Sequence, residues 1–416
     1  MGRPPWFQLE VSPPRPPKGP MSGRVNLLAP EIRADPYPLY AELRRHAPVC
    51  QVDPGGLWVV SRYDDVLQVL KNPRVFSSEG FRQTYRPAWI SNYPLADSAL
   101  VMDPPRHTRL RALINRAFGP PVLTRLEPSV RQLATRIVQA LPVDGPTDFV
   151  TGFAMPLPVG VFGELLSLPR ELHPQLTRWG HHLAQFTGIG PQDTERQQAL
   201  RATVEEIRAH FERVLEGRRA RPGEDLISDL IQARVEGEHL SQTELLGFMF
   251  LLLIGGLDTT QHLMSQCALR LSLQPEWMAA LRARPELLPR FVDEVLRHEP
   301  SAHGAMRLTT EETELAGVRL PAGARLLVLM GSANRDEDRF SDPERFDPER
   351  PPLPILSFGQ GIHFCVGAQL ARLQARLSVE ALLARFTHLS PGGAIAWNSS
   401  LIVRGPKELP LVAHPA

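Results

Sequence analysis

One cysteine of this chain has a local sequence that favours chemistry over simple packing. Cys365 lies in FGQGIHFCVG, residues 358–367, where a segment with a strong helical pattern begins (366–386). Unpaired backbone N–H groups and the positive end of the helix dipole at such a position favour a thiolate over a thiol. The neighbours include three glycines, which let a flat ligand approach the backbone, and two rings that give apolar cover: Gly359, Gly361, Gly367, Phe358 and Phe364. The stretch favours a buried thiolate that ligates iron.

Three other interpretations of Cys365 stay open at this point. A lone cysteine is most often a small core hydrophobe, although packing does not explain the three glycines around it. A catalytic nucleophile would need a base, and His363 is adjacent in sequence. Structural zinc would need several Cys or His ligands at matched spacing, and the sequence offers no such set.

A second unusual segment interrupts the most apolar run of the chain, residues 245–257. Residues 255–260, GGLDTT, place two glycines and a carboxylate where a buried helix tolerates them poorly. Such violations tend to occur at functional places. Gly255 would let a flat ligand come close, and Thr259 can bond a carbonyl of the preceding turn and loosen the helix. The alternative is a core helix with a glycine kink and a polar end.

Two charged groups complete the candidate chemistry. Glu294 and Arg297 share one helix face, and Arg345 can approach them from the irregular segment 335–354, which would lock that segment in place. The alternative is an exposed ion pair that contributes little. His107 and Arg111, four residues apart, present two cations on one face and can bind carboxylates. A solvated basic face is the alternative there.

Taken together, these segments resemble the cytochrome P450 family. Residues 358–367 resemble its haem-binding signature, in which the cysteine is the axial iron ligand, and residues 255–260 resemble its oxygen-activation segment. Glu294–Arg297 resembles the ExxR helix, and residues 343–346, PERF, resemble its partner. The similarity runs from about Pro36 to the C-terminus, and with no membrane anchor in view it points to the soluble bacterial type.

The resemblance implies haem b (iron protoporphyrin IX) as cofactor and assigns a role to each group of residues. Cys365 is the metal ligand, Thr259 the hydrogen-bond donor to dioxygen during its activation, and Asp258 the entry point of protons. The expected cofactor-binding residues are His107, Arg111, Gly255, Arg307, Phe358, Gly359, His363, Cys365 and Gly367. The expected substrate pocket contains Phe81, Tyr85, Trp89, Leu251, Ile254, His303, Ala305 and Leu401.

The implied activity is that of a monooxygenase. Such an enzyme takes O2 and two electrons from a ferredoxin and ferredoxin reductase. It then hydroxylates, O-dealkylates or epoxidises a small to medium-sized hydrophobic organic compound or natural product. The docking face for an acidic ferredoxin would include Arg109, Arg116 and Arg372. The alternatives are oxidative coupling or peroxide-driven oxidation on the same haem, and a non-enzymatic haem sensor.

The region between residues 77 and 100 is expected to cover the substrate, as the corresponding mobile lid does in the family. Its rings recur at four-residue intervals, interleaved with Arg82 and Arg86, although Pro87 argues against an unbroken helix. We therefore expect an aromatic pocket that tolerates anions. Ordinary core packing with surface arginines is the alternative.

Helical patterns dominate the elements that must position these residues. They cover 64–70, 107–118, 122–141, 192–219, 226–235, a helix from 241, 286–298 and 366–386. Ser241 and Glu244 fit a capping box. Two patches are β-prone, 47–63 around a turn at 53–56 and 312–334 around 321–323. We expect a mainly α protein with small β-sheets, in the single-domain triangular fold of the haem-thiolate monooxygenases.

Composition narrows the class of protein further. The 416 residues are 43% hydrophobic and 22% charged, as in a globular protein, and the net charge of +1 gives no electrostatic footprint for nucleic acid. Three scattered cysteines favour a reducing compartment, and the apolar run 245–257 is too short to span a bilayer. Seven prolines predict an extended tail over residues 1–20, ahead of a catalytic domain over 21–416. A cytoplasmic monomer is expected.

Overall fold

This computed structural model describes residues 25–415 except 54, 91, 187, 188 and 191, so the tail expected at 1–20 lies outside the described residues. The helices are α1 Pro30–Ala34, α2 Tyr37–His46, α3 Tyr63–Lys71, α4 Arg106–Ala117, α5 Pro120–Ala140, α6 Pro156–Leu165, α7 His173–Ala184, α8 Thr194–Ala220, α9 Leu226–Gln232, α10 Gln242–Leu253, α11 Thr259–Leu273, α12 Glu276–Ala283, α13 Leu288–His298, α14 Met330–Ala333 and α15 Ala368–Arg385. The strands are β1 Val49–Val52, β2 Leu57–Val60, β3 Phe76–Ser77, β4 Thr147–Asp148, β5 Ala305–Thr309, β6 Thr313–Leu315, β7 Val318–Leu320, β8 Arg325–Val328, β9 Phe386–Pro391, β10 Ala396–Trp397, β11 Pro406–Glu408 and β12 Pro410–Pro415. The expected mainly α fold with small sheets is confirmed.

The largest sheet joins strands from residues 49–77 to strands from residues 305–328. Its strand order is β1-β2-β8-β5-β3, with β1 and β2 forming the hairpin expected around residues 53–56. Gly55 and Gly56 adopt positive φ angles of 75° and 64°, which glycine reaches without steric cost. Strand β8 pairs parallel to β2, more than 260 residues earlier in sequence, with Trp58 opposite Leu326. At the C-terminal side, the guanidinium of Arg404 donates to the carbonyls of Arg33 and Ala34, at 2.5 and 2.8 Å.

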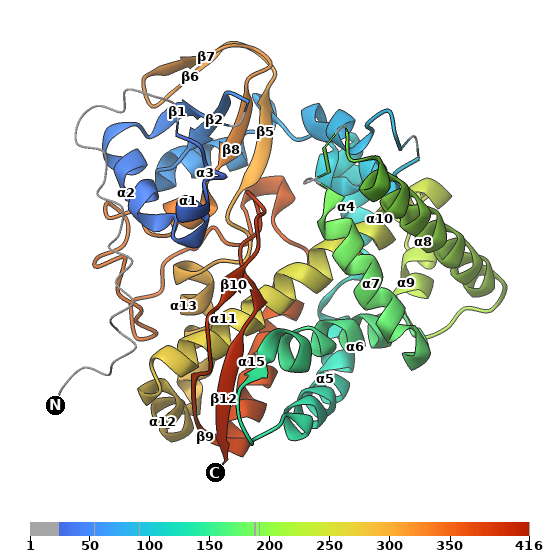
Figure 1. The fold of residues 1–416 in the computed structure, drawn as a ribbon. Helices are drawn as coiled ribbons and strands as arrows, with labels where there is room; N and C mark the ends of the chain where they lie inside the picture. Colours follow the sequence, from blue (N-terminus) through green and yellow to red (C-terminus); the bar gives the residue numbers. More distant parts are fainter. Residues whose placement is uncertain (1–24, 54, 91, 187–188, 191, 416) are drawn as a thin grey trace.

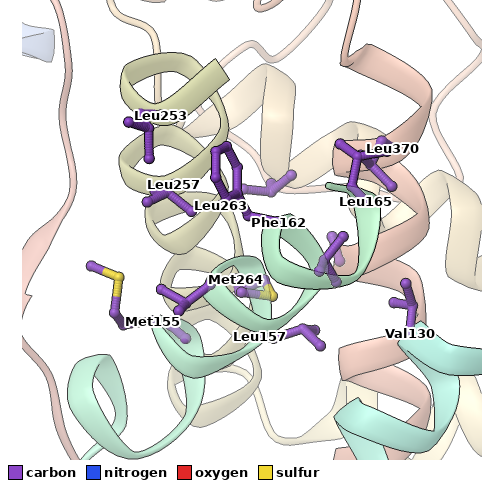
Figure 2. Packing of buried hydrophobic residues seen from close by; sticks show 14 of the residues in the cluster. Val130, Met155, Leu157, Phe162, Leu165, Leu253, Leu257, Leu263, Met264 and Leu370 are labelled. Atoms are coloured by element: carbon purple, nitrogen blue, oxygen red, sulfur yellow. The ribbon is translucent and has the colours of Figure 1, made fainter. Parts of the chain in front are cut away.

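A long helix forms the centre of the molecule. It comprises α10, the π-helical turn η8 (Ile254–Asp258) and α11, and it begins at the expected capping box of Ser241 and Glu244. In Figure 1, α11 crosses the molecule between the sheet of β1, β2, β5 and β8 and the helices α5 to α8. Figure 2 shows part of the main apolar cluster, in which side chains of α5, α6 and α15 pack beside this helix. The core therefore fixes the helix on which residues 255–260 lie.

The same long helix bears on whether the chain could span a membrane. Its 32 residues, Gln242–Leu273, are together long and apolar enough to cross a bilayer by length and composition, although the run 245–257 alone is not. Half of its most apolar window is buried inside the fold. Since Leu253, Leu257, Leu263 and Met264 are at most 2% exposed, the helix owes its composition to core packing.

Candidate active site

The cysteine loop is held by its own backbone. The short helix η10 (Gly361–His363) precedes Cys365, whose N–H donates to the Phe358 carbonyl at 2.9 Å. Gly359 and Gly361 both have φ near +69°. A Cβ at Gly361 would also lie 2.7 Å from the carbonyl oxygen of Leu70, so glycine is needed there on two counts. The loop is a fixed turn packed onto the end of α3, with the sulfur at the start of α15.

The electrostatics of Cys365 differ from the sequence-based expectation of a stabilised thiolate. Although part of its surface is accessible, the side chain lies among enough protein atoms that burial raises the pKa of the thiol above its ordinary value. The Gly367 N–H and the charges of Arg111 and Arg372 oppose this effect without reversing it. The protein alone therefore favours the thiol, and a bound metal cation would have to supply the remaining stabilisation of a thiolate.

The segment 255–260 has the loosened helix that was expected. The Thr259 hydroxyl donates to the Gly255 carbonyl at 2.5 Å, and the helix widens to a π turn over the same residues. Gly255 is exposed although its helix runs through the core, and a Cβ added at Gly255 or Gly256 would meet no other atom within 4 Å. A flat ligand can therefore approach the backbone at this turn.

Four basic residues gather around the cysteine loop. The rings of His107 and His363 lie 4.4 Å apart, and Arg111 donates to the carbonyl of Phe364. His107 is 2% exposed, yet among the described residues neither of its ring nitrogens has a hydrogen-bond partner, and Nε2 of His363 also lacks one there. Arg307 is 7% exposed and donates to the carbonyl of its neighbour Met306 at 2.7 Å. Buried donors without acceptors are costly, so this group fits an anionic ligand.

The protonation of this group corrects another expectation. Burial, assisted by the charges of Arg111 and Arg307, lowers the pKa of His107 to about 4. Burial likewise lowers the pKa of His363 to about 2. Both imidazoles are therefore neutral at neutral pH in the protein alone. Arg307, whose pKa burial lowers to about 10, stays charged. The positive charge offered to carboxylates comes from the arginines, and the histidines offer neutral N–H donors.

Comparison with known proteins decides the family. A sequence model of cytochrome P450 matches residues 189–410. The chain is 38% identical over 398 residues to the cytochrome P450 monooxygenase PikC of Streptomyces venezuelae, covering 93% of each protein. Its fold matches cytochrome P450 CYP109Q5 from Chondromyces apiculatus, with a TM-score of 0.87, 37% identity, and coverage of 94% of this chain and 99% of that one. The chain belongs to the cytochrome P450 family.

As a cytochrome P450, the protein is a haem-binding monooxygenase and thus an oxidoreductase. The residues present fit haem b: an accessible sulfur, an approachable helix turn at Gly255 and unpartnered buried donors at His107 and His363. A further structural match is CYP109E1 from Bacillus megaterium in complex with testosterone. Its TM-score is 0.81 and its identity 33%, and the match covers 91% of this chain and 99% of that one.

The ExxR pair of this P450 is a buried, bidentate ion pair. Nε and Nη2 of Arg297 both lie 2.8 Å from the Glu294 carboxylate, and both side chains are at most 5% exposed. The same guanidinium donates to three backbone carbonyls of the irregular segment, those of Asn334, Pro343 and Arg345. The expected lock therefore exists, and it holds the backbone of residues 334–345.

The third member of this lock is not the residue that was expected. The side chain of Arg345 is 71% exposed and lies 3.9 Å from Asp347, so the prediction that it approaches Glu294 is wrong. Arg350 takes that place, with Nε 3.6 Å from Glu294 and the side chain 9% exposed. The sequence repeats DPER at 342–345 and 347–350. Only the side chain of the second arginine turns inward, and it also donates to the backbone carbonyl of the first.

The three arginines expected to face a ferredoxin have different surroundings. Arg109 forms ion pairs with Glu238 and Glu244. Arg372 binds Asp293 at 2.7 Å and lies over the ring of Phe358. Arg116 is exposed at the end of α4. Two of the three are therefore neutralised locally, and Arg116 remains the best candidate for an intermolecular contact.

The expected lid is aromatic, and its described residues, 77–90 and 92–100, form no regular α-helix. The 3-10 helix η2 (Glu79–Tyr85) is followed by irregular chain, as Pro87 indicated. Its rings gather on Phe186, just after α7, which the sequence analysis missed because a single phenylalanine carries no periodic signal. Tyr85 stacks on this ring at 5.5 Å, and Trp89 and Tyr93 lie 5.8 and 4.8 Å from it. Phe81, 8% exposed, is a core residue here.

The lid arginines do not support the expected tolerance for anions. Arg82 and Arg86 both form ion pairs with Asp97, which is 17% exposed. Arg82 also donates to the Ala96 carbonyl at 2.9 Å. One carboxylate thus neutralises much of the positive charge that the sequence suggested for the substrate.

Among the remaining pocket residues, His303 is a structural histidine. It is fully buried, and its ring nitrogens lie 3.2 and 3.4 Å from the hydroxyls of Tyr37 and Tyr40. Its backbone N–H donates to the backbone carbonyl of Ile402. Burial lowers its pKa well below the ordinary value. Both ring nitrogens contact tyrosines of α2, so the prediction that His303 lines the substrate pocket is wrong. Four other predicted pocket residues are half-buried and stay candidates: Leu251, Ile254, Ala305 and Leu401.

Proposed function

We propose that this P450 inserts oxygen into an uncharged hydrophobic compound of small to medium size, by hydroxylation, O-dealkylation or epoxidation. Cys365 holds the iron. The haem carboxylates are bound by Arg111, Arg307, His107 and His363. Protons enter at Asp258 and are delivered through the hydroxyl of Thr259. The observation that carries this proposal is the π turn at residues 254–258, where a threonine hydroxyl and a carboxylate follow an exposed glycine. Haem, when bound, supplies the electron-rich iron that activates dioxygen.

The protein's own groups supply positioning and proton transfer. The Thr259 hydroxyl, held on the Gly255 carbonyl, is fixed one helical turn away from an approachable backbone. The pKa of Asp258 lies below its ordinary value because histidine contacts outweigh burial, so the group is a carboxylate at neutral pH and can accept a proton. A hydroxyl donor next to an ionised carboxylate suits stepwise proton delivery.

In the variants Thr259→Ala and Asp258→Asn, we expect electrons from NADPH to be consumed without forming product. With a surrogate ferredoxin and ferredoxin reductase, we expect product formed per NADPH consumed to fall about 10-fold, with more hydrogen peroxide released. Thr259→Ser keeps the hydroxyl and should stay near the wild type. If both variants keep the full product yield per electron, the proton-delivery role of these residues is refuted. The alternative of peroxide-driven oxidation or radical coupling is then favoured.

A ferredoxin is the proposed electron donor, and the cytoplasm the proposed compartment, with the enzyme acting as a monomer. Arg116 at the exposed end of α4 supports an acidic partner, since positive charge steers such encounters. All three cysteines, Cys50, Cys267 and Cys365, are free, which supports a reducing compartment.

The proposed substrate is uncharged because Asp97, paired with both Arg82 and Arg86, offsets much of the positive charge of the expected lid. A neutral steroid should bind more tightly than an aromatic carboxylic acid, and the testosterone complex of CYP109E1 supports compounds of that class. Asp97→Asn frees the guanidinium of Arg86 and should raise affinity for aromatic carboxylates about 3-fold, the scale of an exposed ion pair. Titration of the haem absorption spectrum measures both. Tight binding of carboxylates to the unmodified enzyme would contradict the proposal.

A further inference from the structure

A histidine to which the proposed function gives no role of its own lies one helical turn beyond Asp258. Nε2 of His262 is 3.4 Å from Oδ1 of Asp258, with the two side chains 4% and 23% exposed. Residues four apart on a helix face each other, so this contact follows from the helix itself. The proton-handling carboxylate is therefore held from the core side by a buried ring.

The chain makes room for this ring at one position. A Cβ added at Gly405 would lie 2.1 Å from Nδ1 of His262 and 2.2 Å from its Cγ. The backbone of Gly405 does not adopt a positive φ, so the close approach of the ring is the reason for glycine there. The segment at Gly405 and the helix that carries His262 are far apart in sequence, and the glycine leaves the space that the imidazole fills.

The hydrogen bonds of the ring indicate which nitrogen carries the proton. Nε2 lies 3.2 Å from the Asn398 amide nitrogen, while Nδ1 of His262 and Oδ1 of Asn398 have no partner. Turning the Asn398 amide over places its oxygen at Nε2, which then donates to Asn398 and to Asp258 together. In that arrangement the amide NH2 group takes the place of the oxygen, and Nε2 of His262 carries the proton and is a donor to the carboxylate.

The charge on Asp258 is set from two sides. Burial alone would raise the pKa of this carboxyl, but the hydrogen bond from His262 and the charges of His262 and His181 bring it below its ordinary value. His181 is exposed on α7, whose Gly180 packs against Leu257 of the π turn. Asp258 thus has a buried histidine on its own helix and a solvent-facing one on α7.

We propose that His262 is a positioning residue that keeps Asp258 ionised and turned along the helix, so that protons from the His181 side reach Thr259 through it. This inference rests on the proposed role of Asp258. In each transfer, the carboxylate takes one proton from solvent and passes one proton on. It then returns to the ionised form, which the hydrogen bond from the Nε2–H of His262 stabilises.

The test compares variants that remove, replace or displace the ring. His262→Ala should lower product per NADPH about 10-fold and raise the solvent isotope effect on turnover. His262→Gln, which keeps an N–H donor of similar reach, should recover most of the loss. Gly405→Ala should resemble His262→Ala and add little to it, since both act through the ring. His46→Ala is the matched control, because His46 faces Glu42 at the same spacing but is 68% exposed.

A second readout does not depend on turnover. In protein carrying carboxyl-labelled aspartate, with Asp258→Asn to assign the signal, His262→Ala should raise the pKa of Asp258, and His46→Ala should not. If Asp258→Asn impairs coupling while His262→Ala changes neither coupling nor this titration, the inference is overturned and the proposed function stands. If Asp258→Asn has no effect on coupling, the proposed function itself fails. Should His262→Ala not take up haem, Gly405→Ala, which keeps the histidine, decides by the same two measurements.

Discussion

Cys365→Ala should yield a protein that has lost thiolate ligation altogether. Without the sulfur, the reduced, carbon-monoxide-treated protein lacks the absorption band that P450s owe to a thiolate. We expect oxygen insertion to fall at least roughly 1,000-fold, as when a central catalytic group is removed. The loop itself should persist, because the contacts of Gly359 and Gly361 and the bond from the residue 365 N–H to Phe358 are made by backbone.

A matched cysteine separates this effect from general damage. Cys50→Ala removes a half-buried free thiol from β1. It should leave the spectrum and turnover unchanged. If pigment, band and turnover all survived in Cys365→Ala, the haem assignment to this loop would be refuted.

Arg297→Ala should be the most destabilising single change in the charged network. It leaves the buried Glu294 carboxylate without its bidentate partner and frees three backbone carbonyls of the irregular segment. Breaking a buried pair in this way costs about 3 to 5 kcal/mol. The free energy of unfolding from urea titration, together with haem content on purification, measures the effect.

The two DPER repeats provide the control for that prediction. Arg345→Ala should change the free energy of unfolding by less than about 0.5 kcal/mol, because its side chain is 71% exposed. Arg350→Ala should cost more, since its buried guanidinium lies beside Glu294 and donates to the carbonyls of Ser341, Asp342 and Arg345. Equal losses for the two variants would contradict the assignment of Arg350 to the lock.

Helices with a local signal could be predicted, and those without one could not. The capping box at Ser241 fixed the start of α10 correctly because both of its bonds are made within four residues. The helices that were missed are α1, α2, α6, α7, α12 and α14. In α6, eight of ten residues are buried, so its sequence is apolar on nearly every side and shows no helical period.

Site residues followed the same division. Residues that lie in contiguous motifs, such as Cys365 and Asp258–Thr259, could be predicted from the sequence. Contacts between distant segments could not: nothing local distinguishes Arg350 from Arg345, or Phe186 from other phenylalanines. His303 was misplaced for a similar reason, because its partners Tyr37 and Tyr40 lie more than 260 residues away.

The parallel pairing of β2 with β8 has a consequence for how the chain is made. The hairpin of β1 and β2 is synthesised long before the strand that covers its free edge, which ends at Val328. Until then, the N–H and C=O groups on the edge of β2 that faces away from β1 have no partner in this sheet and form a template for pairing with other chains. The growing chain therefore exposes this edge until β8 has been made, and the sheet can close only then.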